Sequence, residues 1–320
     1  MKQILLTSII IISLFSSCRK ELEYLEKTEY LDITVSVPDL DSLWGEDWQS
    51  NLLFEWEEWR YGEIGYPCHK KFCINIFNYN HGEERYSYNK LAMLGTTEFS
   101  LGFGSYALTI HSHDLPETEM QIKSNTIIAN SSETQEIFYY GRVRNVDYSR
   151  ENYEVDIENY EWKRLIECNL TTPHLIYIFQ FPLRGAYHAN HNITASYITN
   201  TQNNFDLHKG ATIGEECHII NNSMHKVSDT LFMCRSVLYN NINNTNKKEI
   251  ILNYSNLLHN SIPIRIEIDS VLRNRPYGGV ITLPIDIDKI IEEYNPEEEE
   301  NINWGVTLQD RETEHIILNV

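Results

Sequence analysis

The side chains best suited to chemistry in this sequence are its histidines, cysteines and carboxylates, so their spacing is the first test for a catalytic or metal site. His111 and His113 lie two residues apart in a predicted strand, would share one face of it, and are followed by Asp114. No third ligand stands at a recognisable spacing, and zinc sites need three or four. We expect exposed histidines and no metal. His188 and His191 fall in an Asn-rich loop and are also expected to be exposed.

The cysteines after residue 18 leave several arrangements open. The run from Cys68 to Cys73 has the form of half a zinc site, but no second close pair of Cys or His completes a tetrahedral set. Disulfides and buried thiols are the alternatives, and their pairing does not follow from spacing. The five cysteines are Cys68, Cys73, Cys168, Cys217 and Cys234. Because their number is odd, at least one thiol is free or pairs between chains.

Sequence motifs of catalysis are missing. The chain has no nucleophile elbow, HExxH helix, phosphate-binding loop or Cys-x-x-Cys pair. Glycosidase carboxylates have no fixed spacing, and 46 acidic residues offer many candidates, yet no particular pair stands out. We therefore expect a protein that is not an enzyme and carries neither catalytic residues nor a cofactor.

A different chemistry is indicated at Cys18. A basic start at Lys2, an apolar run Ile4–Phe15 and the small residues Ser16 and Ser17 precede it. The run is shorter than the roughly 20 residues that span a bilayer, but it fits the apolar region of a secretory signal. Cys18 resembles the lipobox cysteine of bacterial lipoproteins, and this resemblance implies a diacylated thiol and an acylated amino terminus after cleavage. An ordinary cleaved signal with Cys18 as a free thiol is the alternative.

Charge limits the partners. The formal net charge is −20, from 46 acidic and 26 basic residues, so the surface should repel nucleic acid. The polar stretch 19–29 is expected to be a solvated tether. Glu21, Glu23 and Glu26 in this stretch resemble the acidic tags that route some Bacteroidetes lipoproteins to the cell surface. Whether the lipid sits in a periplasmic or a surface-facing leaflet stays open.

Alternating apolar residues predict a chain built of strands. Leu31 to Val37 and Ile262 to Ile268 each alternate with polar residues, which is typical of a strand with one buried face. Leu175 to Phe181 is apolar on both faces, as in a strand between two layers. Asp288 to Tyr294 is the one convincing helix.

This pattern predicts an all-β fold of two tandem β-sandwich domains with one short C-terminal helix. The expected division is a signal peptide 1–18, a tether 19–29, an N-terminal sandwich 30–150 and a C-terminal sandwich 151–320. The junction is placed in the acidic, aromatic stretch 148–160.

Several features together resemble one family. The export signal with Cys18, the early first strand, the turn Phe103-Gly104-Ser105-Tyr106 and the strand around Trp304-Gly305-Val306 are similar to the Bacteroidales fimbrillin-associated anchor lipoproteins. The resemblance implies two transthyretin-like, Greek-key sandwiches. It also implies a non-catalytic lipoprotein of the outer membrane and cell surface that anchors a fimbria or serves as its accessory subunit.

The family resemblance makes one sequence detail informative. Shaft subunits of such fimbriae lose their first strand to an Arg-specific protease, and a neighbour's strand fills the groove, a case of β-strand addition. This chain has no arginine between Arg19 and Arg60. Its first strand therefore cannot be cut from the next one in that way, as an anchor requires.

The expected contact with a fimbrillin subunit lies in the closing strands. Residues 302–308 and 316–320 alternate and are expected to pair as a hairpin at which a neighbour pairs or from which a strand is donated. The candidate partner-binding residues are Ile302, Trp304, Val306, Leu308, Ile316, Leu318 and Val320.

A second hypothesis belongs to another class of function. Exposed aromatic side chains can stack on sugar rings, which would make this a surface lipoprotein that binds a glycan or another ligand. The candidates are Trp44, Trp48, Trp56 and Trp59, of which Trp56 lies in a strand-like run and is the most readily explained as core.

Overall fold

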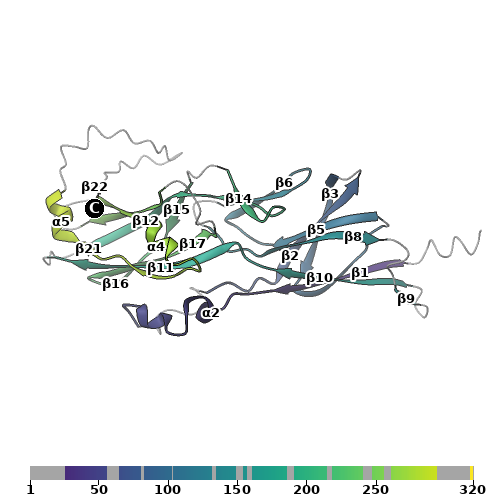
Figure 1. Cartoon of the computed structure of the whole chain (residues 1–320), viewed down its shortest axis with the longest axis horizontal. Coiled ribbons are helices and arrows are strands. Elements are labelled where there is room, and N and C mark those ends of the chain that lie inside the picture. Colours follow the sequence, from purple (N-terminus) through teal and green to yellow (C-terminus); the bar gives the residue numbers. More distant parts are fainter. Residues whose placement is uncertain are drawn as a thin grey trace, which may run out of the picture. The chain divides into compact units, whose positions relative to one another are not determined.

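The regular secondary structure of the computed structural model is mainly β-strand (Figure 1). The structure describes residues 26–55, 65–80, 83–102, 104–131, 135–148, 154–156, 161–185, 191–214, 218–240, 247–255, 261–293 and 318–319.

The chain forms two compact units, each assembled from three segments. Unit 1 comprises Met1–Ser36, His69–His113 and Tyr140–Thr171, and unit 2 comprises Val37–Cys68, Asp114–Tyr139 and Thr172–Val320. The boundary expected at residue 150 divides the chain once. Each unit instead combines three segments that are separate in the sequence and in contact in space. The existence of two separately folding parts stays a prediction.

In its described residues, unit 1 contains two four-stranded sheets. The first has the order β4 (Gly95–Phe99), β1 (Glu26–Val35), β10 (Glu161–Leu170), β9 (Glu154–Asp156). The second has the order β3 (Glu83–Met93), β2 (Lys71–Asn80), β5 (Gly104–Ser112), β8 (Tyr140–Tyr148).

The two sheets of unit 1 pack as a sandwich because alternate side chains on each are apolar. Leu31 and Ile33 of β1 are buried, as the alternation predicts, and Ile74 of β2 is buried as well. At Gly141 of β8 the sheets come so close that an added Cβ would lie 2.6 Å from the Leu170 side chain on β10.

The part of unit 2 that the structure describes contains three sheets. The first orders β16 (Met224–Ser228), β17 (Leu231–Tyr239), β11 (His174–Arg184) and β20 (Gly279–Thr282), with β21 (Ile285–Asp286) also paired to β11. The second orders β15 (His218–Asn222), β12 (Asn192–Thr201), β18 (Glu249–Ser255), β19 (Ile262–Glu267) and β22 (Leu318–Asn319). The third orders β14 (Ala211–Ile213), β13 (Asn204–Asp206), β7 (Ile127–Ser131) and β6 (Thr118–Ile122).

The core of unit 2 lies between its first two sheets. Tyr177, Phe179 and Phe181 of β11 share one buried cluster with Ile262 and Ile264 of β19. This is sheet-on-sheet packing, and it confirms the all-β sandwich class.

The other face of β11 is covered by a segment from the N-terminal half of the chain. Ile178 packs there against Leu40 of helix α2 (Leu40–Trp44) and Trp48 of the 3₁₀-helix η1 (Trp48–Asn51). We call residues 37–55 the covering segment. Because β11 is buried on both faces, the layered position predicted for Leu175 to Phe181 is confirmed.

The C-terminal helix is confirmed as α5 (Ile287–Glu293). The described residues also contain two shorter helices, α2 and α4 (Asp269–Arg273). Each is only five residues long and is too short for an apolar period to stand out. In the described ranges, no helix has the length and apolarity to cross a membrane.

Candidate partner-binding site

The first strand is held inside a sheet. β1 pairs in parallel with β10 from Glu26↔Glu161 to Val35↔Leu170, and it pairs antiparallel with β4 on its other side. Parallel pairing of strands so far apart in sequence closes a long loop, and alternation alone does not reveal it. Cys18, the expected lipidation site, lies outside the described residues.

Of the strands expected to bind a partner at the C-terminal end, the structure describes Leu318 and Asn319, which form β22. β22 pairs in parallel with β19, with Leu318 opposite Ile264 and Asn319 opposite Arg265. The remaining candidates fall outside the described residues, so their hairpin stays a prediction: Ile302, Trp304, Val306, Leu308, Ile316 and Val320.

Strand β19 has one apolar and one charged face. Ile262 and Ile264 are buried in the core, and Ile266 packs against it. On the other face, Arg265 Nη1 lies 2.8 Å from Glu249 Oε2 of β18. β18 occupies one edge of β19 along its whole length, whereas β22 covers two residues of the other edge. A strand that pairs with this edge of β19 is therefore held by main-chain hydrogen bonds, and charged side chains lie beside it on one face of the sheet.

The tryptophans of the second hypothesis do not form an exposed platform in the described part of the chain. Trp48 is 2% exposed, and its Nε1 donates to Asp41 Oδ1 at 2.7 Å. Trp44 is half-buried, meets Trp48 edge to face at 5.0 Å and donates from Nε1 to the Tyr277 carbonyl at 3.1 Å. Trp56 and Trp59 lie outside the described residues.

One buried amide fixes the covering segment to the sheet, and sequence reasoning missed it. Gln180, fully buried on β11, accepts the Leu53 backbone N–H at 2.7 Å and donates from Nε2 to the Asn51 carbonyl at 2.9 Å. Its Nε2 also lies 3.1 Å from Thr282 Oγ1. The only signal in the sequence is one polar residue in the apolar run Leu175 to Phe181.

Two of the histidines that were expected to be exposed, His111 and His191, are buried. His111 is buried, its Nδ1 lies 2.7 Å from the Ser112 carbonyl, and burial lowers the pKa of its imidazole to about 4. His113 is exposed, as expected. The prediction of an exposed His191 is wrong: it is 7% exposed, with Nδ1 2.6 Å from the Tyr254 hydroxyl. Among the described residues, no three His, Cys, Asp or Glu side chains gather in a metal-binding group.

The described cysteines are free thiols. Cys68 is exposed, Cys73 is intermediate, and Cys168 and Cys234 are buried. Burial raises the pKa of both buried thiols to about 12, so they stay protonated and unreactive at neutral pH.

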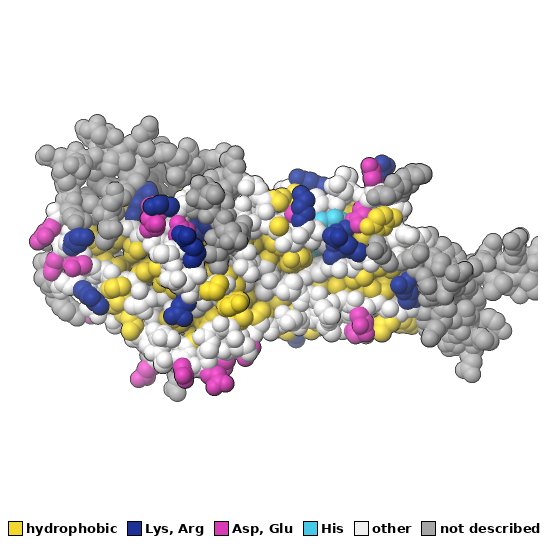
Figure 2. Space-filling model, in the orientation of Figure 1, with side chains coloured by type: hydrophobic (Ala, Val, Ile, Leu, Met, Phe, Trp, Pro, Cys, Tyr) yellow, Lys and Arg dark blue, Asp and Glu magenta, His cyan; other side chains and the backbone are white. Residues whose placement is uncertain are grey.

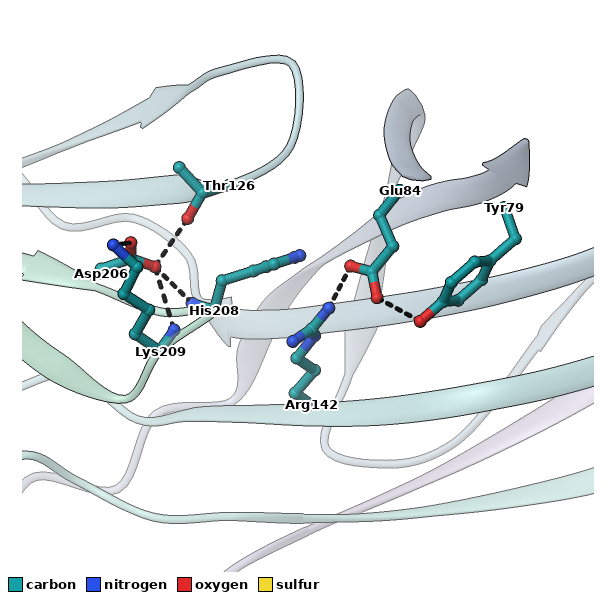
Figure 3. Close-up of polar contacts among 7 residues, drawn as sticks. All are labelled: Tyr79, Glu84, Thr126, Arg142, Asp206, His208 and Lys209. Atoms are coloured by element: carbon teal, nitrogen blue, oxygen red, sulfur yellow. Dashed lines mark hydrogen bonds and ion pairs between the residues drawn. The ribbon is translucent and has the colours of Figure 1, made fainter. Parts of the chain in front are cut away.

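A buried carboxylate in unit 2 is engaged by its own turn. Asp206 Oδ1 accepts hydrogen bonds from Thr126 Oγ1 at 2.6 Å and from the backbone N–H groups of His208 and Lys209 at 2.8 and 3.0 Å (Figure 3). Burial raises the pKa of this carboxyl, but the three donors outweigh that effect and hold the pKa below its ordinary value. The group closes the turn after β13 and joins it to β7.

A second polar cluster lies in unit 1. Glu84 of β3 pairs with Arg142 of β8 and accepts a hydrogen bond from the Tyr79 hydroxyl at 2.6 Å (Figure 3). This hydrogen bond raises the pKa of Tyr79. All three groups are occupied with one another, as in a structural ion pair.

Comparison with known proteins identifies a fold and no family. No protein-family model matches the sequence, and no curated protein is significantly similar to it. The structure is similar to a candidate adhesin from Bacteroides ovatus ATCC 8483, with 10% identity over 84% of this chain and 94% of that one, at a TM-score of 0.55.

Two further solved structures have TM-scores below 0.5. A candidate polysaccharide-binding protein from Bacteroides thetaiotaomicron VPI-5482 matches with 10% identity over 82% of this chain and 91% of that one, at 0.48. The fimbrial anchor protein Mfa2 from Porphyromonas gingivalis matches with 9% identity over 81% and 90%, at 0.44.

Proposed function

We propose that this chain is a non-catalytic lipoprotein of the cell surface, held in the outer membrane through Cys18, that anchors a fimbria or serves as its accessory subunit. The position of β1 carries the proposal. A pull on the N-terminal tether acts along β1 and loads the ladders to β10 and β4 in shear, so that many hydrogen bonds resist together.

An adhesion role is supported by the likeness to the candidate adhesin from Bacteroides ovatus. The proposed joining mode is strand pairing at the edge of β19, where β22 already adds in parallel. In such pairing, main-chain hydrogen bonds supply the affinity and side chains select the partner.

A strain that lacks the whole protein tests this function. We expect its fimbriae to be shed into the medium or to change in length, and we expect the wild-type chain to restore them. Normally attached fimbriae combined with lost glycan binding would favour the ligand-binding alternative. The control is a strain with Leu165→Glu, a change at an exposed residue of unit 1 far from β19 in sequence.

A further inference from the structure

Unit 1 carries a concentrated apolar surface at the end of strand β3. Of the nine large hydrophobic side chains that are exposed among the described residues, four fall within seven positions: Tyr88 (40%), Leu91 (52%), Met93 (51%) and Leu94 (41%). Side chains alternate between the two faces of a strand, so Leu91 and Met93 share one face of β3 and Tyr88 lies on the other. Exposed apolar residues scattered singly are ordinary, but here both faces of one strand end expose them, which indicates an interaction site.

Positive charges border this group. Lys90 is exposed between Tyr88 and Leu91, and Lys70, also exposed, accepts the Leu94 N–H at its carbonyl at 2.9 Å. Within the described residues, neither lysine has an ion pair. In a chain of net charge −20, two uncompensated lysines beside an apolar group favour an acidic partner. We call Lys70, Tyr88, Lys90, Leu91, Met93 and Leu94 the β3 surface.

Strand β3 also offers backbone groups for pairing. It ends its sheet, and its described ladder runs to β2 only. Thr97 Oγ1 accepts the Met93 N–H at 3.1 Å and donates to the Met93 carbonyl at 3.3 Å, so the backbone groups of Met93 point away from β2. Backbone direction alternates along an antiparallel strand, and Leu91 and Asn89 therefore point the same way.

The rest of β3 is protected against pairing. A register irregularity at Ser87 and the charges of Glu83 and Arg85 disfavour strand addition over the first half. Thr97 occupies the backbone of Met93. The accessible length is thus centred on Asn89 and Leu91, where the exposed apolar and basic side chains also lie.

We infer that the β3 surface receives a short, extended, acidic segment of a partner protein, which adds as a strand beside Asn89 and Leu91. Its apolar residues cover Leu91 and Met93, and its carboxylates pair with Lys70 and Lys90. A lipid surface fits less well, because Gly95 lies opposite Ile33, about 23 Å along β1 from Glu26, where β1 begins.

This inference rests on the proposed function only for the presence of a protein partner. It adds a second contact surface, distinct from the β19 edge. An experiment can disprove either contact without disproving the other. Fimbriae shed by the strain that lacks the protein, without acidic peptide bound at β3, would leave the anchor role intact and remove this assignment.

Amide hydrogen exchange of the full chain in detergent tests the assignment with two designed peptides, EEVTVEVE and its charge-reversed control KKVTVKVK. We expect the acidic peptide to slow exchange in residues 88–93 and the basic one to leave it unchanged. Leu91→Glu should weaken binding of the acidic peptide about tenfold or more, whereas Leu165→Glu, an equally exposed leucine of unit 1, should not. Asn89→Pro should also weaken it, because it removes an outward N–H without breaking the ladder to β2.

Three results would overturn the assignment. Equal protection by both peptides, or none, would remove the charge complementarity. Self-association in sedimentation that Leu91→Glu abolishes would assign the surface to a second copy of the chain. Binding to vesicles of phosphatidylglycerol and phosphatidylcholine that depends on Lys90 and Leu91 would assign it to a membrane. Unchanged thermal unfolding of each variant is the check that the loss of binding is local.

Discussion

Burial controls the chemistry of individual side chains in this protein. His174 is 2% exposed, stacks on Tyr239 at 4.6 Å between ring centroids and meets Phe138 edge to face at 4.9 Å. Burial, reinforced by the positive charge of Arg235, lowers the pKa of its imidazole to about 3. The folded protein therefore keeps this histidine neutral at a pH where the unfolded chain protonates it.

A pH dependence of stability follows with a definite sign. The pKa of His174 is about 3 in the folded state and about 6.5 in the unfolded state, so the unfolded chain binds one more proton between these values. The free energy of unfolding should fall with acidification in that window, by up to about 1.4 kcal/mol per pH unit for this group. His174→Phe, which fits the aromatic cluster, should flatten the slope in urea titrations between pH 6 and 4. An unchanged slope would contradict the assignment, and His113→Phe, an exposed site, is the control.

Lipidation is a prediction about one atom, the thiol sulfur of Cys18. Cys18→Ser removes the only acceptor that the lipobox resemblance implies. We expect loss of labelled fatty acid and either an uncleaved precursor or release from membranes, because stable anchoring requires two or more acyl chains. Cys68→Ser, at an exposed thiol, should label normally. Labelling that persists in Cys18→Ser would refute the prediction.

At the scale of elements, the covering segment shows how one buried amide joins distant parts of the chain. Gln180→Leu removes the partners of the Leu53 N–H and the Asn51 carbonyl. An unsatisfied buried polar group costs about 1–3 kcal/mol, so unfolding should shift to lower denaturant concentration, and amide exchange should accelerate in residues 49–54. Gln49→Leu, at an exposed position of η1, should do neither. Unchanged exchange in Gln180→Leu would show that apolar packing alone holds the segment.

Local pattern explains which elements were predictable. Alternation predicted β1, β19 and the strand character of β11, because side-chain period is a local property of each strand. It did not predict that β1 pairs with β10 or that β13 pairs with β7, since pairing depends on contacts between distant residues. The burial of His111 and His191 was not predicted either: the contact that covers His191 depends on Tyr254, which lies 63 positions away.

At the scale of the whole molecule, charges of both signs and hydrophobic side chains intermix on the face shown in Figure 2. The division into two parts near residue 150 predicts that limited proteolysis cuts between about Tyr148 and Cys168. The ladder of β10 with β1 should protect the chain from Glu161 onward, so the cut should fall before that residue. The same ladder should keep the fragments together in gel filtration until they are denatured. Resistance across the whole stretch would argue for one continuous fold.

The central claim is that the chain holds a fimbria through strand pairing at its C-terminal end. Deleting Glu314 to Val320 removes β22, the described partner of the β19 edge, and leaves the strands of unit 1 unaltered. Electron microscopy of cells with this deletion, together with fimbrillin in the medium, measures the consequence directly. We predict a lipidated, membrane-associated protein at wild-type level, with fimbriae shed into the medium or altered in length. Fimbriae of normal length that stay attached, with the truncated protein present at the wild-type level, would contradict the claim.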